Sequence, residues 1–122
     1  VGTLHLVEAD LAALDCARIN APDPRARYHW TDAVTWMSPA LLDTVVMNPP
    51  FHVGRKADPT LGQDFVRSAA RNLKPNGSLW MVANRHLPYE QVLESCFRDV
   101  REVPGTDGFK IFHATRPSRT KR

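Results

Sequence analysis

The sequence predicts an α/β fold of three layers with a mostly parallel sheet. Short apolar runs alternate with amphipathic segments of 10 to 13 residues along the 122-residue chain, which is the pattern of repeated strand-helix-strand units. Hydrophobic residues make up 43% and charged residues 24% of the chain, as in a globular domain. No apolar run approaches the roughly 18 residues of a membrane span, and the first residues lack the layout of a signal peptide. We therefore expect one small, soluble, cytoplasmic unit without membrane contact.

The sequence of the first half predicts three strands, with one helix between the first and the second. Residues 3–8 have a strand-like apolar register, and residues 10–20 place apolar side chains at helical spacing, with Asp10 as a cap. The segment APDPR breaks this helix, after which residues 26–32 form a second strand that ends on an acid. A short turn, SPALL, leads into a third strand at residues 43–47.

The second half predicts two more helices and a final hairpin. After a corner of sequence NPPF and a polar loop, residues 61–73 carry apolar side chains every fourth residue. The segment KPNG ends this helix and offers Gly77 for a positive φ. A strand at residues 78–84 and a helix at residues 88–97, with proline in its first turn, follow. Residues 98–115 contain two strands around the turn GTDG and predict an antiparallel hairpin.

Three polar residues follow predicted strands. Glu8, Asp32 and Asn48 each stand at the carboxyl end of a strand. In parallel α/β sheets, ligands bind beyond these carboxyl ends, so we expect the three side chains to line one common edge. Each has a plainer alternative, since Glu8 could be a solvated acid and Asp32 could form an Asx turn. Trp30 and Trp36 are interpreted as core residues.

Several motifs resemble those of class I S-adenosylmethionine-dependent methyltransferases. The spacing of Glu8, Ala13, Leu14 and Asn20 resembles their second motif, WTDA resembles their adenine-contacting turn, and NPPFH resembles their fourth motif. The phrases LKPNGSLWMVANRHLPYE and GFKIFHAT are similar to the closing segments of the bacterial 16S and 23S rRNA guanine-N2 methyltransferase family, the methyltransferase small domain. The resemblance covers essentially all of the chain and implies a Rossmann-like methyltransferase fold.

The resemblance also implies a cofactor and its ligands. The cofactor would be S-adenosylmethionine, bound by Glu8 through the ribose hydroxyls, by Asp32 and Ala33 near the adenine, and by Asn48. The resembled fold has a central first strand that ends in a Gly-rich loop, and no GxG segment exists here. We therefore expect residues 1–115 to be a partial catalytic domain that belongs to a longer polypeptide or pairs with another chain.

The NPPF corner has a chemical rationale. An exocyclic amino nitrogen on a purine is a poor nucleophile because its lone pair is delocalised into the ring. The Asn48 side-chain oxygen and the Pro49 carbonyl can both accept from that NH₂ group and turn the lone pair toward a methyl donor. Pro49 and Pro50 fix φ and remove competing amide donors, and Phe51 can stack on the base. As an isolated sequence, NPPF could also be an ordinary turn.

Cations after this corner and at the end of the chain suggest RNA contact. His52, Arg55 and Lys56 follow the corner, and residues 116–122, RPSRTKR, form a basic tail with four cations. Both segments could instead be plain solvated surface. Neither the two cysteines nor the five histidines have the spacing of metal ligands, so we expect no metal. The expected partner is ribosomal RNA or the small ribosomal subunit.

The resemblance, together with the NPPF corner, implies methyl transfer to the N2 amino group of a guanine in ribosomal RNA, most simply 16S rRNA. Methylation of adenine N6 or of a protein glutamine stays open, because those reactions need the same corner, although their enzymes more often have Tyr at the position of Phe51. A non-catalytic RNA-binding fragment of a methyltransferase is the other alternative.

Overall fold

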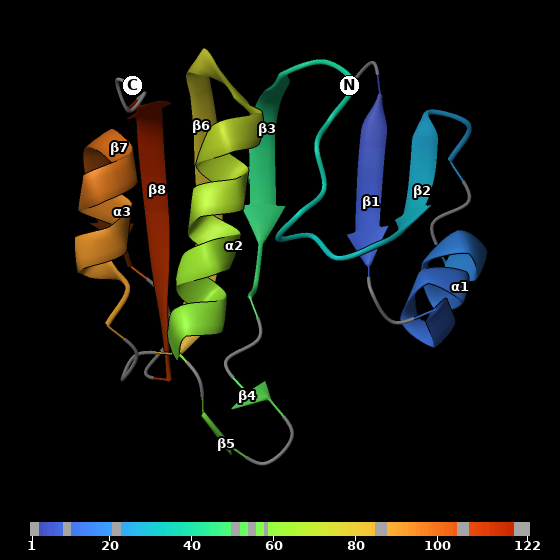
Figure 1. The fold of residues 1–122 in the computed structure, drawn as a ribbon, viewed down its shortest axis with the longest axis horizontal. Coiled ribbons are helices and arrows are strands. Elements are labelled where there is room, and N and C mark those ends of the chain that lie inside the picture. Colours follow the sequence, from blue (N-terminus) through green and yellow to red (C-terminus); the bar gives the residue numbers. More distant parts are fainter. Residues whose placement is uncertain are drawn as a thin grey trace. The chain divides into compact units, whose positions relative to one another are not determined.

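The structure separates into two compact parts. The computed structural model describes residues 3–8, 11–20, 23–49, 52–53, 56–57, 59–84, 88–104 and 108–118. The chain divides into a first unit, Val1–Met37, and a second unit, Ser38–Arg122, and each is considered by itself (Figure 1). The boundary expected between a catalytic domain and a basic tail at residue 115 stays a prediction. Within the described residues, no helix has the length and apolar character to cross a membrane.

The first unit is a strand-helix-strand element. β1 (Leu4–Glu8) leads through α1 (Leu11–Asn20) to β2 (Ala26–Trp30). β1 and β2 pair in parallel, with Glu8 opposite Trp30. Leu14 of α1 and Ala26 of β2 are buried. The structure therefore confirms the two strands and the helix predicted for this part of the sequence.

The second unit is built on a four-stranded sheet. The strand order is β3 (Leu42–Met47), β6 (Leu73–Asn84), β8 (Phe109–Pro117) and β7 (Phe97–Val103). β3 and β6 are parallel, whereas β8 is antiparallel to both β6 and β7. The predicted C-terminal antiparallel hairpin is therefore confirmed.

The strand directions give this sheet two distinct ends. β3, β6 and β7 run the same way, so they end where β8 begins (Figure 1). We call this end the carboxyl edge and define it by Met47, Asn84 and Phe109. The opposite end, where Phe97 pairs with Pro117, is called the far edge.

Two helices cover one face of the sheet. α2 (Pro59–Asn72) and α3 (Glu90–Cys96) lie on the same side in Figure 1. Between them and the sheet lies one apolar cluster, which includes Val66, Leu79 and Phe112, each no more than 1% exposed. This cluster anchors the middle strands of the second unit.

The buried stripe of α2 differs in part from the predicted one. The sequence pattern predicts that Leu61 and Phe65 face the core, but both are only half-buried. Gly62 and Val66 are buried in their place. The stripe is therefore displaced by one residue in the first half of the helix, because the four-residue spacing does not identify which neighbour meets α3.

A close approach explains this displacement. A Cβ atom added at Gly62 would lie 2.1 Å from the hydroxyl oxygen of Tyr89. Tyr89 is buried and directly precedes α3, which is shorter than the helix predicted at residues 88–97. Only glycine leaves room for the tyrosine ring against α2, so this contact joins the two helices.

Gly77 does not take the positive φ expected from the KPNG segment. β6 instead begins at Leu73, directly after α2. A Cβ atom at Gly77 would lie 2.9 Å from the Leu73 side chain and 3.0 Å from the Lys74 carbonyl oxygen. The glycine is needed there for a close packing contact and not for a left-handed cap.

A small hairpin follows β3, where the sequence predicts only a polar loop. β4 (His52–Val53) and β5 (Lys56–Ala57) pair in an antiparallel ladder of two residues each. Figure 1 shows this hairpin beyond the carboxyl end of β3. Strands this short have too few residues for a period-two pattern to be visible in the sequence.

Candidate functional site

Asn48 lies at the carboxyl edge of the second unit, as predicted. It directly follows Met47, the last residue of β3, which pairs with Met81 and packs against the apolar cluster. Asn48 is exposed and Pro49 is buried. The amide group of Asn48 is therefore offered to solvent from a backbone that is held on both sides by packed residues.

The remaining predicted residues of this segment are placed only in part. Pro50, Phe51 and Arg55 lie outside the described residues. His52 begins β4 and Lys56 begins β5, in the short ladder in which Val53 pairs with Lys56. The backbone of these two predicted RNA-contacting residues is thus brought together beyond β3.

Glu8 and Asp32 lie at one edge of the first unit. Glu8 is the last residue of β1, opposite the last residue of β2, Trp30, and Asp32 follows two residues later. The two acids therefore follow parallel strands that end side by side. The expectation that they share an edge with Asn48 stays a prediction, since Asn48 belongs to the second unit.

Asp32 forms the local turn that was its plainer alternative. Its Oδ1 accepts a hydrogen bond from the Val34 amide at 2.9 Å, and its carbonyl oxygen accepts from Thr35 at 3.2 Å and from Trp36 at 3.0 Å. Asp32 stays exposed, and a carboxylate has acceptor capacity on both oxygens. The turn that fixes Ala33 in place is therefore compatible with a ligand-binding role for Asp32.

A ring cluster in the first unit was not predicted. His5 Nδ1 and His29 Nε2 are 2.9 Å apart, and the Trp36 ring lies 5.4 Å and 5.1 Å from the two imidazoles. Burial lowers the pKa of His29, and the neighbouring His5 lowers it further. Trp36 thus packs against the two imidazoles but is only half-buried, whereas the sequence suggested a core residue. The histidines meet through the β1–β2 register, which the sequence alone does not reveal.

The described residues contain no group of three or more His, Cys, Asp or Glu side chains arranged to hold a metal ion. Cys16 and Cys96 are both free thiols.

Phe109 and Lys110 also lie at the carboxyl edge, and the sequence did not identify them as candidate site residues. Phe109 begins β8 opposite Asn84 and is 45% exposed. Its neighbour Lys110 donates a hydrogen bond from Nζ to Glu90 Oε2 at 2.6 Å, and this bond lowers the pKa of Glu90. Glu90 and Lys110 are 20 residues apart, so only the packing of α3 on the sheet brings them together.

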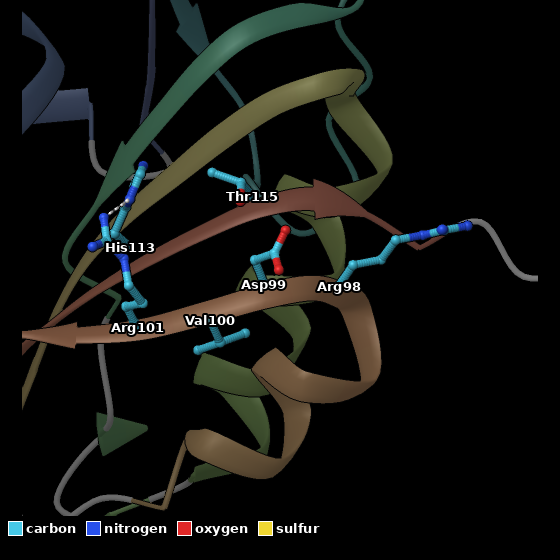
Figure 2. Close-up of a pocket in the computed structure, with 6 residues that line it drawn as sticks. All are labelled: Arg98, Asp99, Val100, Arg101, His113 and Thr115. Carbon is cyan, nitrogen blue, oxygen red and sulfur yellow. Dashed lines mark hydrogen bonds between the residues drawn. The ribbon is translucent and has the colours of Figure 1, made fainter.

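A polar hollow lies on β7 and β8, displaced from the carboxyl edge toward the far edge. It is lined by Arg98, Asp99, Val100, Arg101, His113 and Thr115 (Figure 2). Figure 2 shows Arg101 pointing toward His113, with Nη2 and Nδ1 3.5 Å apart. The His113 ring stacks on Trp80 at 4.1 Å between ring centroids. Asp99 accepts a bond from Arg116 Nε at 2.5 Å, which lowers the pKa of the carboxyl group.

Comparisons with known proteins give consistent matches. The family model described as methyltransferase small domain matches residues 1–113. Ribosomal RNA small subunit methyltransferase C of Hahella chejuensis is 37% identical over 116 residues, which cover 93% of this chain and 34% of that protein. Ribosomal RNA large subunit methyltransferase G of Shewanella amazonensis is 33% identical over 119 residues, with 93% and 31% covered. The chain thus spans about a third of the length of these curated relatives.

Solved structures give the same picture. The structure of T. Thermophilus 16S rRNA N2 methyltransferase in complex with AdoMet and guanosine matches with a TM-score of 0.75 and 32% identity, over 93% of this chain and 31% of that one. The N-methyltransferase NodS of Bradyrhizobium japonicum has a TM-score of 0.72 at 14% identity and covers 96% of this chain and 67% of that one, a likeness of fold alone. The predicted α/β fold class is therefore confirmed.

Proposed function

Because the chain belongs to the methyltransferase small domain family, we propose that it is the catalytic part of an enzyme that methylates ribosomal RNA with S-adenosylmethionine. The acceptor we propose is the N2 amino group of a guanine, in 16S rRNA. The names of the relatives and the AdoMet and guanosine in the similar structure support this assignment. The observation that carries it is the exposed Asn48 placed directly after the anchored end of β3.

The chain's own residues would prepare the acceptor nitrogen. Asn48 Oδ1 and the Pro49 carbonyl oxygen accept the two N–H bonds of the guanine amino group, which directs the nitrogen lone pair outward. Bound S-adenosylmethionine supplies an electrophilic methyl group on a sulfonium. On transfer of this methyl group the bonding electrons would stay on the sulfur, and the amino nitrogen would release a proton to water. Because Pro49 is buried, its carbonyl is held in place before the substrate arrives.

The first unit would hold the cofactor. Glu8 would accept from the ribose hydroxyls, as acids at strand ends do in nucleotide sites. Asp32 and Ala33 would lie at the adenine, and Asn48 would be a further cofactor contact. The parallel β1–β2 pair, which brings the positions of Glu8 and Asp32 to one edge, supports this proposal.

Ribosomal RNA would make further contacts through His52, Arg55 and Lys56, and through the basic residues 116–122. The β4–β5 hairpin, which contains His52 and Lys56 and lies beyond the carboxyl end of β3, supports the first set. Displaced counterions would make this binding salt-dependent.

We also propose that further polypeptide, from the same protein or from another chain, completes the cofactor site. Within the described strands, β3 pairs with β6 alone and β1 pairs with β2 alone. The β3 sequence LDTVVM contains neither Lys nor Pro, the residues that usually protect a sheet edge from pairing. A strand inserted beside β3 would form hydrogen bonds with the backbone N–H and C=O groups on the side of β3 away from β6. The greater length of the relatives is consistent with such a strand.

The test of the proposed reaction is Asn48→Ala in the complete enzyme. Loss of one preorganised contact to the reacting group is expected to lower the single-turnover rate about 10²-fold to 10³-fold, while cofactor affinity changes little. The matched control is Asn76→Ala, since Asn76 is an exposed asparagine in the Lys74–Gly77 segment, near the start of β6 and away from the carboxyl edge. A near wild-type rate for Asn48→Ala would eliminate the mechanism.

Acceptor class is tested separately. Methyl transfer to ribosomal RNA is expected, whereas DNA and a release-factor-like protein should accept no methyl group. Calorimetry with S-adenosylmethionine distinguishes an enzyme from a non-catalytic RNA-binding fragment, because the fragment would bind no cofactor.

A further inference from the structure

We propose that Phe109 stacks on a base of the substrate RNA that neighbours the guanine held at Asn48. This inference rests on the function proposed above and adds a residue that engages the substrate beyond the reacting base. It follows from the position of Phe109, its exposure, and the ion pair of the next residue in the chain.

Phe109 and Asn48 lie at the same end of the second unit. Asn48 follows the pair of Met47 with Met81 and is therefore level with Val82, whereas Phe109 pairs with Asn84. β8 is two strands away from β3. With about 4.8 Å between strands and about 3.4 Å per residue, the two backbones are about 12 Å apart. This distance is suited to neighbouring nucleotides, not to a single base.

The ring of Phe109 faces solvent from the side of the sheet opposite the helices. Lys110 contacts α3 through Glu90, and Phe112 lies in the apolar cluster between the sheet and the helices. Because side chains alternate along a strand, Phe109 lies on the other face. It is 45% exposed, whereas Phe97 and Phe112 of the same unit are 2% and 1% exposed.

An exposed aromatic side chain by itself is common on protein surfaces. The environment of the next residue, Lys110, supplies a second observation. The Lys110 side chain is only 17% exposed and is joined to Glu90 at 2.6 Å. This bond ties the first turn of α3 to the start of β8. The backbone that carries Phe109 is therefore ordered before any ligand binds, which reduces the entropy lost on stacking.

The expected contact is apolar and tolerant of sequence. Stacking on an aromatic side chain uses the face that all four bases share. The charge of Lys110 is already paired with Glu90, so phosphate attraction is not its main contribution. Phe109 would hold a flanking nucleotide and would not select the methylated guanine.

The test is binding of a short guanine-containing RNA oligonucleotide to the complete enzyme at fixed salt. Phe109→Ala is expected to weaken affinity about tenfold, and Phe109→Tyr and Phe109→Trp should retain wild-type affinity. The matched control is Trp80→Ala, because Trp80 is a part-exposed aromatic on the same face of the sheet, further from the carboxyl edge. In the complete enzyme, Phe109→Ala should raise KM and leave kcat unchanged.

A second set of variants tests the positioning role of Lys110. Lys110→Glu should weaken RNA binding less than Phe109→Ala does, and the double exchange Lys110→Glu with Glu90→Lys should restore it. Failure of the double exchange in a chain with wild-type thermal stability would contradict that role.

Three other results of the RNA-binding measurements would contradict one or both proposals. Equal affinity of wild type and Phe109→Ala would overturn the inference while leaving the proposed function intact. Weaker binding by Trp80→Ala alone would place RNA on the middle of the sheet and would also overturn it. A folded complete enzyme that binds no RNA would contradict the RNA interaction on which both proposals depend.

Discussion

The two units bury different kinds of side chain. The second unit has a continuous apolar cluster that includes Leu79, Leu93 and Phe112. In the first unit, the described buried apolar residues are Leu14 and Ala26, and they are accompanied by the half-buried rings of His5, His29 and Trp36. Apolar packing is independent of pH, whereas a hydrogen bond between two imidazoles needs one donor and one acceptor. Acidity should therefore affect the stability of the first unit more than that of the second.

Removing a large side chain from the apolar cluster of the second unit should be the most destabilising change. Phe112→Ala should lower the free energy of unfolding by about 3–5 kcal/mol, through lost burial and the cavity left behind. Urea denaturation, with amide exchange of β6 and β8, measures the loss. Phe109→Ala is the control, because an exposed phenylalanine in the same strand should change stability by about 0.5 kcal/mol or less. Equal losses for the two variants would contradict the assigned core.

The next effect tests the packing of α2 against α3. Gly62→Ala should lower stability by about 1–3 kcal/mol, because the new methyl group meets the buried Tyr89 ring. Gly108→Ala should be close to neutral, since its Cβ would meet nothing within 4 Å. Thermal unfolding of both variants checks the difference, and a neutral Gly62→Ala would show that α2 does not approach Tyr89 so closely.

A smaller effect concerns the first unit and pH. The pKa of His29 is lowered from its ordinary value of 6.5, so the unfolded chain binds a proton more readily than the folded one. Stability is therefore greatest above pH 6.5 and falls as the pH drops below that value. Amide exchange of β1 and β2 between pH 7 and pH 5 measures the change, which His29→Gln should abolish. A matching loss in β6 and β8 would remove the contrast between the units.

The smallest effect concerns the exposed pair of Asp99 and Arg116. The bond from Arg116 lowers the pKa of Asp99 below its ordinary value of 3.8. Its contribution is present above that pH and is lost as the pH falls through the lowered value. Asp99→Asn should leave Tm at pH 7 nearly unchanged, because surface pairs contribute little, and should flatten its decline below pH 4. A large loss at pH 7 would show that the pair is structurally important.

Local patterns predicted the order of the elements well. The strands around residues 3–8 and 43–47 and the final hairpin follow from alternation and turn residues within a few positions of each other. The placement of Asn48 after a strand follows in the same way, since NPP cannot continue β3. These features depend on neighbours in the sequence and need no tertiary information.

Features that depend on register could not be predicted. The Lys110 and Glu90 pair and the stack of Trp80 on His113 join residues 20 or more positions apart. The positive φ predicted for Gly77 was wrong, because the sequence does not reveal that this glycine packs against Leu73. The resemblance to methyltransferases supplied the site residues themselves, and the common edge of Glu8, Asp32 and Asn48 stays a prediction.

The reversed direction of β8 separates two potential RNA contacts along the length of the sheet. β8 begins with Phe109 near the carboxyl edge and ends with Arg116 and Pro117 at the far edge. At about 3.4 Å per residue, the eight steps from Phe109 to Pro117 place these ends about 27 Å apart. A free nucleoside can occupy only one of them. Simultaneous engagement of both ends requires a polymer several nucleotides long, so discrimination between ribosomal RNA and its monomers would come from molecular reach as well as from base chemistry.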